Sequence, residues 1–281
     1  MFNKTLRNNI QLPQIGLGTW QITNRDVVSE VIAHAFNAGY RLIDTAAAYS
    51  NEMAIAKAIA ALGLPREEYY LADKAWNTSR GYAEVQEACK RSLRKLKTEY
   101  LDLYLIHWPA SMKLYTDWAK INAETWRGLE ELYRQGLVRA IGVCNFKVHH
   151  LEELKKTAEI MPHINQIECH PGMNQQEVTD YCHNHGIVVE ASSPLGNGQI
   201  LSYEGFLNIS SKYGKTAAQL CIRWLVQRGL MAIPKSVRLD RLKENIDIFD
   251  FEIEEDDMRI IGEMPYCGGI GIDADEVTAF G

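Results

Sequence analysis

The chain of 281 residues lacks the features that define several large classes of protein. No apolar run approaches the roughly 18 residues that a membrane-spanning helix needs. The first ten residues carry no apolar signal-peptide core, and we therefore expect a cytoplasmic protein. Basic residues are in the minority, 30 against 36 acidic ones, and the formal charge of −6 provides no general attraction for nucleic-acid phosphates. These absences argue against membrane and nucleic-acid partners.

Cysteine is also sparse, with six residues scattered along the chain and no C-x-x-C pair. We therefore expect reduced thiols rather than a disulfide framework. Cys169–His170 and Cys182–His183, with His185, have the chemistry of zinc ligands, but zinc sites show tighter spacing, such as two cysteines two to four residues apart. We predict that the protein has no metal site.

Short apolar runs alternate with amphipathic segments along most of the chain. A hairpin is expected first, over residues 2–12, and a helical stripe such as that in residues 27–36 follows each run. The runs are continuously apolar, which predicts parallel strands covered on both faces, and eight strand–helix units fit a (β/α)₈ TIM barrel of the α/β class. The eight runs are residues 15–18, 40–44, 69–74, 101–107, 140–145, 164–168, 187–191 and 231–233.

An open doubly wound sheet is the alternative fold. Its dinucleotide-binding version needs the pattern G-x-G-x-x-G after the first strand, but residues 16–21 are GLGTWQ and lack the third glycine. No P-loop and no G-x-S-x-G elbow occurs either. Since no linker or shift in composition divides the chain, we predict a single barrel domain over residues 1–281.

Polar side chains stand where the predicted strands end. Asp44 closes the second run, Lys74 the third and His107 the fourth. In a barrel these ends open onto one face, where active sites are built. Each residue alone is explained equally well or better by a paired or hydrogen-bonded role in the core, but three ionisable groups at one buried mouth would be costly without a use. Further polar residues at or just beyond the fifth, sixth and eighth runs are Asn145, Gln166 and Lys235.

Tyr49 lies in the loop after Asp44 and completes a possible proton-transfer group. A phenol with a pKa near 10 is a poor acid or base at neutral pH. A neighbouring ammonium stabilises its phenolate, and a carboxylate keeps that ammonium charged and oriented. Tyr49, Lys74 and Asp44 together provide this chain of groups.

Several longer motifs contain or flank these residues. Together the motifs span nearly the whole chain. They are GLGTW at 16–20, GYRLIDTA at 39–46, LADKAW at 71–76, YLDLYLIHWP at 100–109, GVCNF at 142–146, NQIECHP at 165–171, SPLG at 193–196 and IPKS at 233–236. On these motifs the sequence resembles the aldo-keto reductases, a family of NAD(P)H-dependent carbonyl reductases. Within this family, the sequence most resembles the prokaryotic diketogluconate and methylglyoxal reductases.

The resemblance implies a catalytic tetrad of Asp44, Tyr49, Lys74 and His107. In the implied reaction a hydride passes from NADPH to the carbon of an aldehyde or ketone, and Tyr49 protonates the oxygen. Lys74, held by Asp44, lowers the pKa of Tyr49, while His107 orients the carbonyl oxygen.

The resemblance also implies an NADPH site. Lys235, Ser236 and Arg241 are expected on the 2′-phosphate, which would favour NADPH over NADH because a guanidinium and an ammonium suit a dianion. Glu244 and Asn245 are expected on the adenine. The residues implied at the nicotinamide, its ribose and the pyrophosphate are Thr19, Asp44, Cys144, Asn145, Gln166, Ser192, Ser193, Leu195 and Gly196.

Two positions depart from the family pattern at the nicotinamide. Cys144 stands where serine is usual, and a thiol donates a weaker hydrogen bond to the carboxamide. Ser192 stands where an aromatic ring usually stacks on the nicotinamide, so we expect NADPH to bind several-fold more weakly than in relatives. Residues 266–271 also depart from the pattern, and the sequence leaves open how the C-terminal segment selects substrates.

An aromatic wall is expected around the substrate, formed by Trp20, Trp76 and Trp108 beside Tyr49 and His107. Such a wall suits small aldehydes, methylglyoxal or keto sugars. We expect a monomer that acts on a small carbonyl compound. The alternatives are an NADPH-binding regulatory or structural member of the same fold with little turnover, and a metal-dependent barrel hydrolase, for which the sequence lacks a ligand set.

Overall fold

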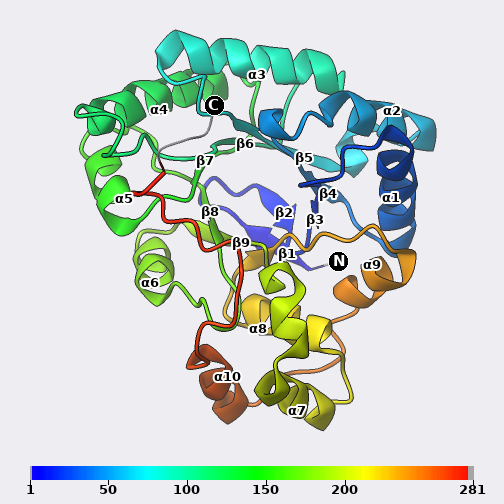
Figure 1. Ribbon diagram of the computed structural model, residues 1–281. Helices are drawn as coiled ribbons and strands as arrows, with labels where there is room; N and C mark the ends of the chain where they lie inside the picture. The colour runs from blue at the N-terminus through cyan, green and yellow to red at the C-terminus, as the bar shows by residue number, and fades with distance from the viewer. Residues whose placement is uncertain (1, 278–281) are drawn as a thin grey trace.

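Eight of the short apolar runs form the parallel strands of a closed barrel (Figure 1). The computed structural model describes residues 2–277. The strands follow one another around the sheet in chain order, and a parallel bridge between Ile15 and Ala232 joins the first to the last. The strands are β3 (Leu17–Gly18), β4 (Leu42–Asp44), β5 (Tyr70–Ala75), β6 (Leu103–Ile106), β7 (Ile141–Cys144), β8 (Ile164–Glu168), β9 (Val188–Ser192) and β10 (Met231–Ala232).

Helices surround the barrel and cover the outer face of its sheet (Figure 1). The stripe predicted in residues 27–36 is buried in α1, which ends where Gly39 takes the left-handed conformation with φ 106°. The helices are α1 (Arg25–Ala38), α2 (Glu52–Leu62), α3 (Tyr82–Leu96), α4 (Trp118–Arg134), α5 (Val148–Lys155), α6 (Gln176–Asn184), α7 (Glu204–Lys212), α8 (Ala217–Gln227), α9 (Leu239–Ile246) and α10 (Glu255–Gly262), with 3-10 turns η1 (Ala47–Tyr49), η2 (Arg66–Glu68) and η3 (Gly196–Ser202). No helix among residues 2–277 is long and apolar enough to cross a bilayer.

The predicted hairpin closes one end of the barrel. Strands β1 (Asn3–Thr5) and β2 (Gln11–Pro13) pair antiparallel, and Leu6 and Leu12 pack with the apolar residues inside the barrel, such as Leu103. The (β/α)₈ barrel with an N-terminal hairpin is therefore confirmed. Because the hairpin fills the amino-terminal end, the carboxyl ends of the strands are left as the open face.

Candidate active site

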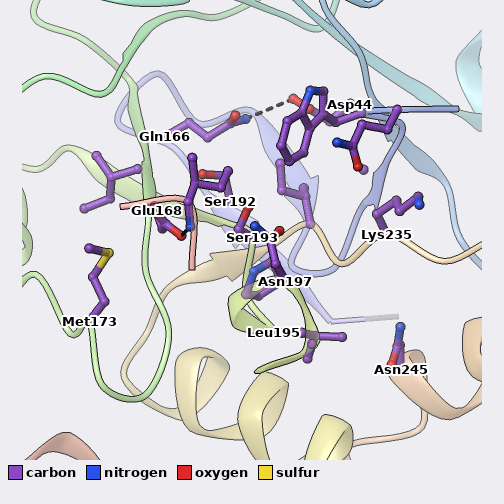
Figure 2. Close-up of a pocket in the computed structure, with 18 of the residues that line it drawn as sticks. Asp44, Gln166, Glu168, Met173, Ser192, Ser193, Leu195, Asn197, Lys235 and Asn245 are labelled. Carbon is purple, nitrogen blue, oxygen red and sulfur yellow. Dashed lines mark hydrogen bonds between the residues drawn. The ribbon is translucent and has the colours of Figure 1, made fainter. Parts of the chain in front are cut away.

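A cavity of about 1300 Å³ opens at the carboxyl ends of the strands (Figure 2). Two predicted residues are not on its wall: Lys74 is fully buried beneath it, and Gly196 lies between the wall residues Leu195 and Asn197. The predicted residues that line the cavity are Thr19, Trp20, Asp44, Tyr49, Trp76, His107, Trp108, Cys144, Asn145, Gln166, Ser192, Ser193, Leu195, Lys235, Ser236, Arg241, Glu244 and Asn245. The structure thus brings together nearly all of the residues that the sequence singled out.

A buried ion pair forms the floor of this cavity. Asp44 ends β4, and the next strand, β5, directs Lys74 inward toward it, with Lys74 Nζ 2.6 Å from Asp44 Oδ1 and 2.9 Å from the carbonyl oxygen of Thr45. Burial is the largest single effect and would lower the pKa of Lys74, but the charge and hydrogen bond of Asp44, with smaller contributions from Tyr49 and Cys144, together outweigh burial and raise that pKa above its ordinary value. Lys74 is therefore an ammonium at every pH at which the protein would be assayed.

Tyr49 lies directly over this ammonium, at the end of the 3-10 turn η1. Lys74 Nζ is 5.3 Å from the centre of the phenol ring. Burial raises the pKa of Tyr49, and the nearby charge of Lys74 lowers it by less, so that the net change is upward. The lysine thus acts in the predicted direction, but in the free protein burial is the larger effect. Tyr49 consequently holds its proton throughout the neutral range.

His107 follows β6 and faces Tyr49 across the cavity, with the two ring centres 5.8 Å apart. It is 8% exposed, and the indole of Trp76 packs edge-on against it at 5.1 Å. Burial and the charge of Lys74 both lower its pKa, which keeps the imidazole neutral. Its Nδ1 is buried without a hydrogen-bond partner among the described residues, so the ring retains unused bonding capacity beside the cavity.

The amide of Gln166 connects the ion pair to a second buried carboxyl group. Gln166 Nε2 donates to Asp44 Oδ2 at 2.9 Å (Figure 2) and to Glu190 Oε2 at 2.6 Å. Both amide hydrogens are thereby used, and Gln166 Oε1 acts as an acceptor, to which the thiol of Cys144 donates over 3.7 Å. Asn145, with φ 63°, donates its amide to the carbonyl oxygen of His107.

Glu190 is a site residue that the sequence analysis missed. It is fully buried inside β9, and burial together with the charge of Asp44 raises its pKa to about 7. A glutamate within the apolar run at 187–191 was the available signal. The apolar pattern of the run does not show whether such a residue faces the barrel interior or the helices, so it did not identify Glu190 as a site residue.

Two exposed cations stand at the other end of the cavity. Lys235 follows β10, and Arg241 lies in the first turn of α9. Neither side chain makes an ion pair or hydrogen bond with another residue in the range 2–277. Glu244, one turn along α9, accepts a hydrogen bond from Thr216 at 2.6 Å. An anion in this part of the cavity would meet two uncommitted positive charges.

The cysteine–histidine pairs at 169–170 and 182–185 do not form a ligand cluster in the described part of the chain. The group there whose ligand atoms lie close enough to hold a metal ion is His149, His150 and Asp275. Asp275 is bonded to Lys147 and His149, however, and His150 Nδ1 accepts the backbone N–H of Lys147. The neutral form of His150 therefore carries its proton on Nε2, the atom that would have to bind the metal.

Comparisons with known proteins agree with this geometry. The model of the aldo/keto reductase family matches residues 14–264. Glyoxal reductase of Bacillus subtilis (strain 168) is 45% identical over 272 residues, which cover 97% of this chain and 96% of that protein. Methylglyoxal reductase DkgA of Escherichia coli (strain K12) is 40% identical over 274 residues, 96% of each protein.

Solved structures match equally well. The crystal structure of a Gox0644 mutant in complex with NADPH is 38% identical, with a TM-score of 0.90 over 99% of each chain. The alignments include nearly the whole chain, and the barrel fold is the one that the sequence predicted. The chain belongs to the aldo/keto reductase family and is an enzyme of that family.

Proposed function

We propose that the protein reduces small aldehydes and ketones with NADPH, and that Tyr49 is the proton donor. The observation that carries this proposal is the stack of Asp44, Lys74 and Tyr49 at the cavity floor, with neutral His107 facing it. A protonated phenol above a permanent ammonium is suited to donate a proton to an oxygen that gains negative charge, because the ammonium stabilises the phenolate left behind.

Four side chains have distinct roles in the proposed reaction. Tyr49 gives its proton to the carbonyl oxygen of the substrate. Lys74 stabilises the resulting phenolate, and Asp44 keeps Lys74 charged and directed toward the phenol. His107, which is neutral, orients the carbonyl oxygen by donating a hydrogen bond. When bound, NADPH would supply the hydride that the substrate carbon accepts.

The cavity fits NADPH at both of its ends. The Oε1 atom of Gln166 accepts one weak bond from the Cys144 thiol and has a second lone pair for an amide hydrogen, as the nicotinamide carboxamide would require. At the other end Lys235 and Arg241 are uncommitted cations, which suit the 2′-phosphate that distinguishes NADPH from NADH. The NADPH complex of the structural relative and the named activities of the two curated relatives, on glyoxal and methylglyoxal, support the same proposal.

The direct test is steady-state oxidation of NADPH by the purified protein with methylglyoxal, a nitrobenzaldehyde and a diketo sugar. We expect turnover with at least one of them. Absence of consumption with every substrate, together with measurable NADPH binding, would instead support a binding protein with little turnover.

Removal of the two uncommitted cations should weaken the binding of NADPH much more than that of NADH. Lys235→Ala with Arg241→Ala is expected to raise the NADPH dissociation constant by about 30- to 800-fold, because each of the two lost charge-assisted hydrogen bonds is worth about 1–2 kcal/mol at such an exposed site. The dissociation constant of NADH, which has no 2′-phosphate, should change by less than about threefold. Fluorescence titration with both cofactors measures this. Lys243→Ala is the matched control, since this exposed lysine of α9 is not on the cavity wall; equal weakening of both cofactors would contradict the assignment.

An aromatic ring at position 192 should strengthen cofactor binding. Ser192 ends β9 and lies half-buried on the cavity wall. Ser192→Tyr is expected to lower the NADPH dissociation constant by about 2- to 10-fold, because a stacked ring is worth roughly 0.5–1.5 kcal/mol. Ser192→Ala, which removes the hydroxyl without adding a ring, should give no such gain. An unchanged dissociation constant in Ser192→Tyr would show that the missing ring does not limit binding.

A further inference from the structure

The segment after α10 forms part of the cavity wall. Residues 263–277 contain neither helix nor strand, and they run from α10 across the open face of the barrel to α5 (Figure 1). Ile270, Ile272 and Ala274 line the cavity. Beyond α10 the segment passes on the side of the barrel where α6 and α5 lie, away from α9, which carries Arg241 (Figure 1). The side chains of this segment are therefore expected to affect substrate binding more than cofactor binding.

The segment is attached first at Glu168, the last residue of β8. The Glu168 carboxylate accepts the backbone N–H of Ile270 at 2.5 Å and that of Gly271 at 2.8 Å. Gly269 has φ 146°, and a Cβ there would lie 2.5 Å from Glu168 Oε1, so a side chain at 269 would disrupt the contact. Burial would raise the pKa of Glu168, but these two N–H groups and the imidazole of His170, whose Nε2 lies 3.5 Å from Glu168 Oε1, together outweigh burial and lower it. Glu168 is therefore a charged anchor that sets the position of Ile270.

The second attachment lies at the start of α5. Lys147 Nζ is 2.5 Å from Asp273 Oδ1 and 2.8 Å from Asp275 Oδ2, and His149 Nε2 is 3.0 Å from Asp275 Oδ1. Ile272 is held between the two attachments. Its side chain is 45% exposed at the cavity, in a position that the backbone on both sides restrains.

These attachments set the charge on this side of the cavity. Lys147 is the cation on this side of the cavity wall, and it already contacts two carboxylates. Glu168 adds a third negative charge. His150, behind Asp275, is uncharged at neutral pH because burial lowers its pKa to about 4. Lys113 does not change the net charge of this group, since it is paired with Glu276. The net charge of this group is negative, and no cation in it is left unpaired among the described residues.

The walls between these charges are apolar. Trp20, Trp76 and Trp108 line the same cavity as Ile270 and Ile272. Indole and aliphatic surfaces favour an apolar group on the substrate. A carboxylate on the substrate would have to leave water for this surface and approach the unbalanced negative charge, and both effects are unfavourable.

We infer that the substrate half of the cavity takes uncharged aldehydes and ketones with an apolar or aromatic group beside the carbonyl, and discriminates against carbonyl compounds that carry a carboxylate. Ile270 and Ile272 are the specificity-determining residues, and Glu168 and Lys147 position them. This inference rests on the proposed reductase function and narrows its substrate class.

The test compares two substrates of nearly the same shape, 4-formylbenzoate and its methyl ester, by kcat/KM with NADPH. The ester should be preferred by about tenfold or more, as expected for a like charge about 10 Å from the carboxylates in a partly shielded site. Ile272→Arg should reduce the ester-to-acid ratio by about tenfold, since it adds a cation at the wall. The ratio should also fall with added salt, because salt screens the repulsion.

Ile260→Arg is the matched control. Ile260, on α10, is 44% exposed, almost the same as Ile272, but it is not on the cavity wall. This variant should leave the ratio unchanged, which separates a charge in the cavity from a change in total charge. If Ile272→Arg does not fold, Asp273→Asn replaces it, and its removal of one negative charge should reduce the ratio by several-fold.

Two results would overturn the inference. One is a ratio near unity, or below it, in the unaltered protein. The other is a high ratio that Ile272→Arg, or Asp273→Asn in its place, does not change, because the preference would then come from the intrinsic reactivity of the ester. Either result leaves the reductase function standing as long as NADPH is consumed with the ester. Binding of NADPH without consumption in the presence of any carbonyl compound would contradict the proposed function itself.

Discussion

Tyr49→Phe should lower kcat for carbonyl reduction by about 10³-fold, within the 10²- to 10⁴-fold range typical of general acid catalysis. The substitution removes only the hydroxyl group, and the ring can keep its place above Lys74. The NADPH dissociation constant should change by less than about threefold, since the hydroxyl acts on the substrate. Steady-state kinetics and a cofactor titration measure the two quantities.

Tyr82→Phe is the control for the loss of a phenol hydroxyl. Tyr82 begins α3, is 39% exposed and is not on the cavity wall. Its variant should keep the full kcat. If Tyr49→Phe kept more than about one tenth of kcat, Tyr49 would be excluded as the principal proton donor. The raised pKa of Tyr49 adds a further expectation: in the free protein the phenol should stay protonated at least to pH 9, as its absorbance on titration would show.

Lys74→Met should affect both stability and activity. Lys74 and Asp44 are 0% and 2% exposed, and removal of one partner leaves the other charge buried without compensation. We expect a loss of about 3–5 kcal/mol in the free energy of unfolding, as is typical for a broken buried ion pair. Turnover should fall by about 10²-fold or more, because the phenolate of Tyr49 loses the ammonium that stabilises it. Denaturant unfolding and steady-state kinetics measure the two effects.

The double variant Asp44→Asn with Lys74→Met separates these two effects. With both charges removed, no unpaired charge is buried, and stability should recover by at least about 2 kcal/mol relative to Lys74→Met. Turnover should stay low, since the ammonium is still missing. Lys90→Met, which breaks an exposed pair with Glu87, should cost less than about 1 kcal/mol. Recovery of turnover in the double variant would show that Lys74 serves stability alone.

The residues at the strand ends were predictable because their signal is local. Each apolar run marks a strand, and the polar residue that ends it, such as Asp44 or His107, must reach the same face of any parallel barrel. The motifs then predicted which of these residues act together. The predicted strand limits differ from the observed ones by at most three residues.

Other parts of the site were not predictable, because they depend on contacts between distant segments. The hydrogen bond between Gln166 and Glu190 requires both side chains to face the barrel interior, and burial on both faces of a parallel strand removes the alternation that would reveal this. The pKa of Tyr49 is a similar case. The sequence supplies the ammonium that lowers it, but the burial that raises it further appears only in the packed structure.

The sequence by itself therefore determined the barrel and the family, and it predicted the catalytic groups, because strand patterns and motif spacing depend on neighbouring residues. The tertiary structure decided the charge at the substrate side. Lys147 is free to bind an anion as far as its neighbours in the sequence show, and only the return of the C-terminal segment places Asp273 and Asp275 on it, more than 120 residues along the chain. Electrostatic selection of this kind depends on distances in space, which no local pattern encodes.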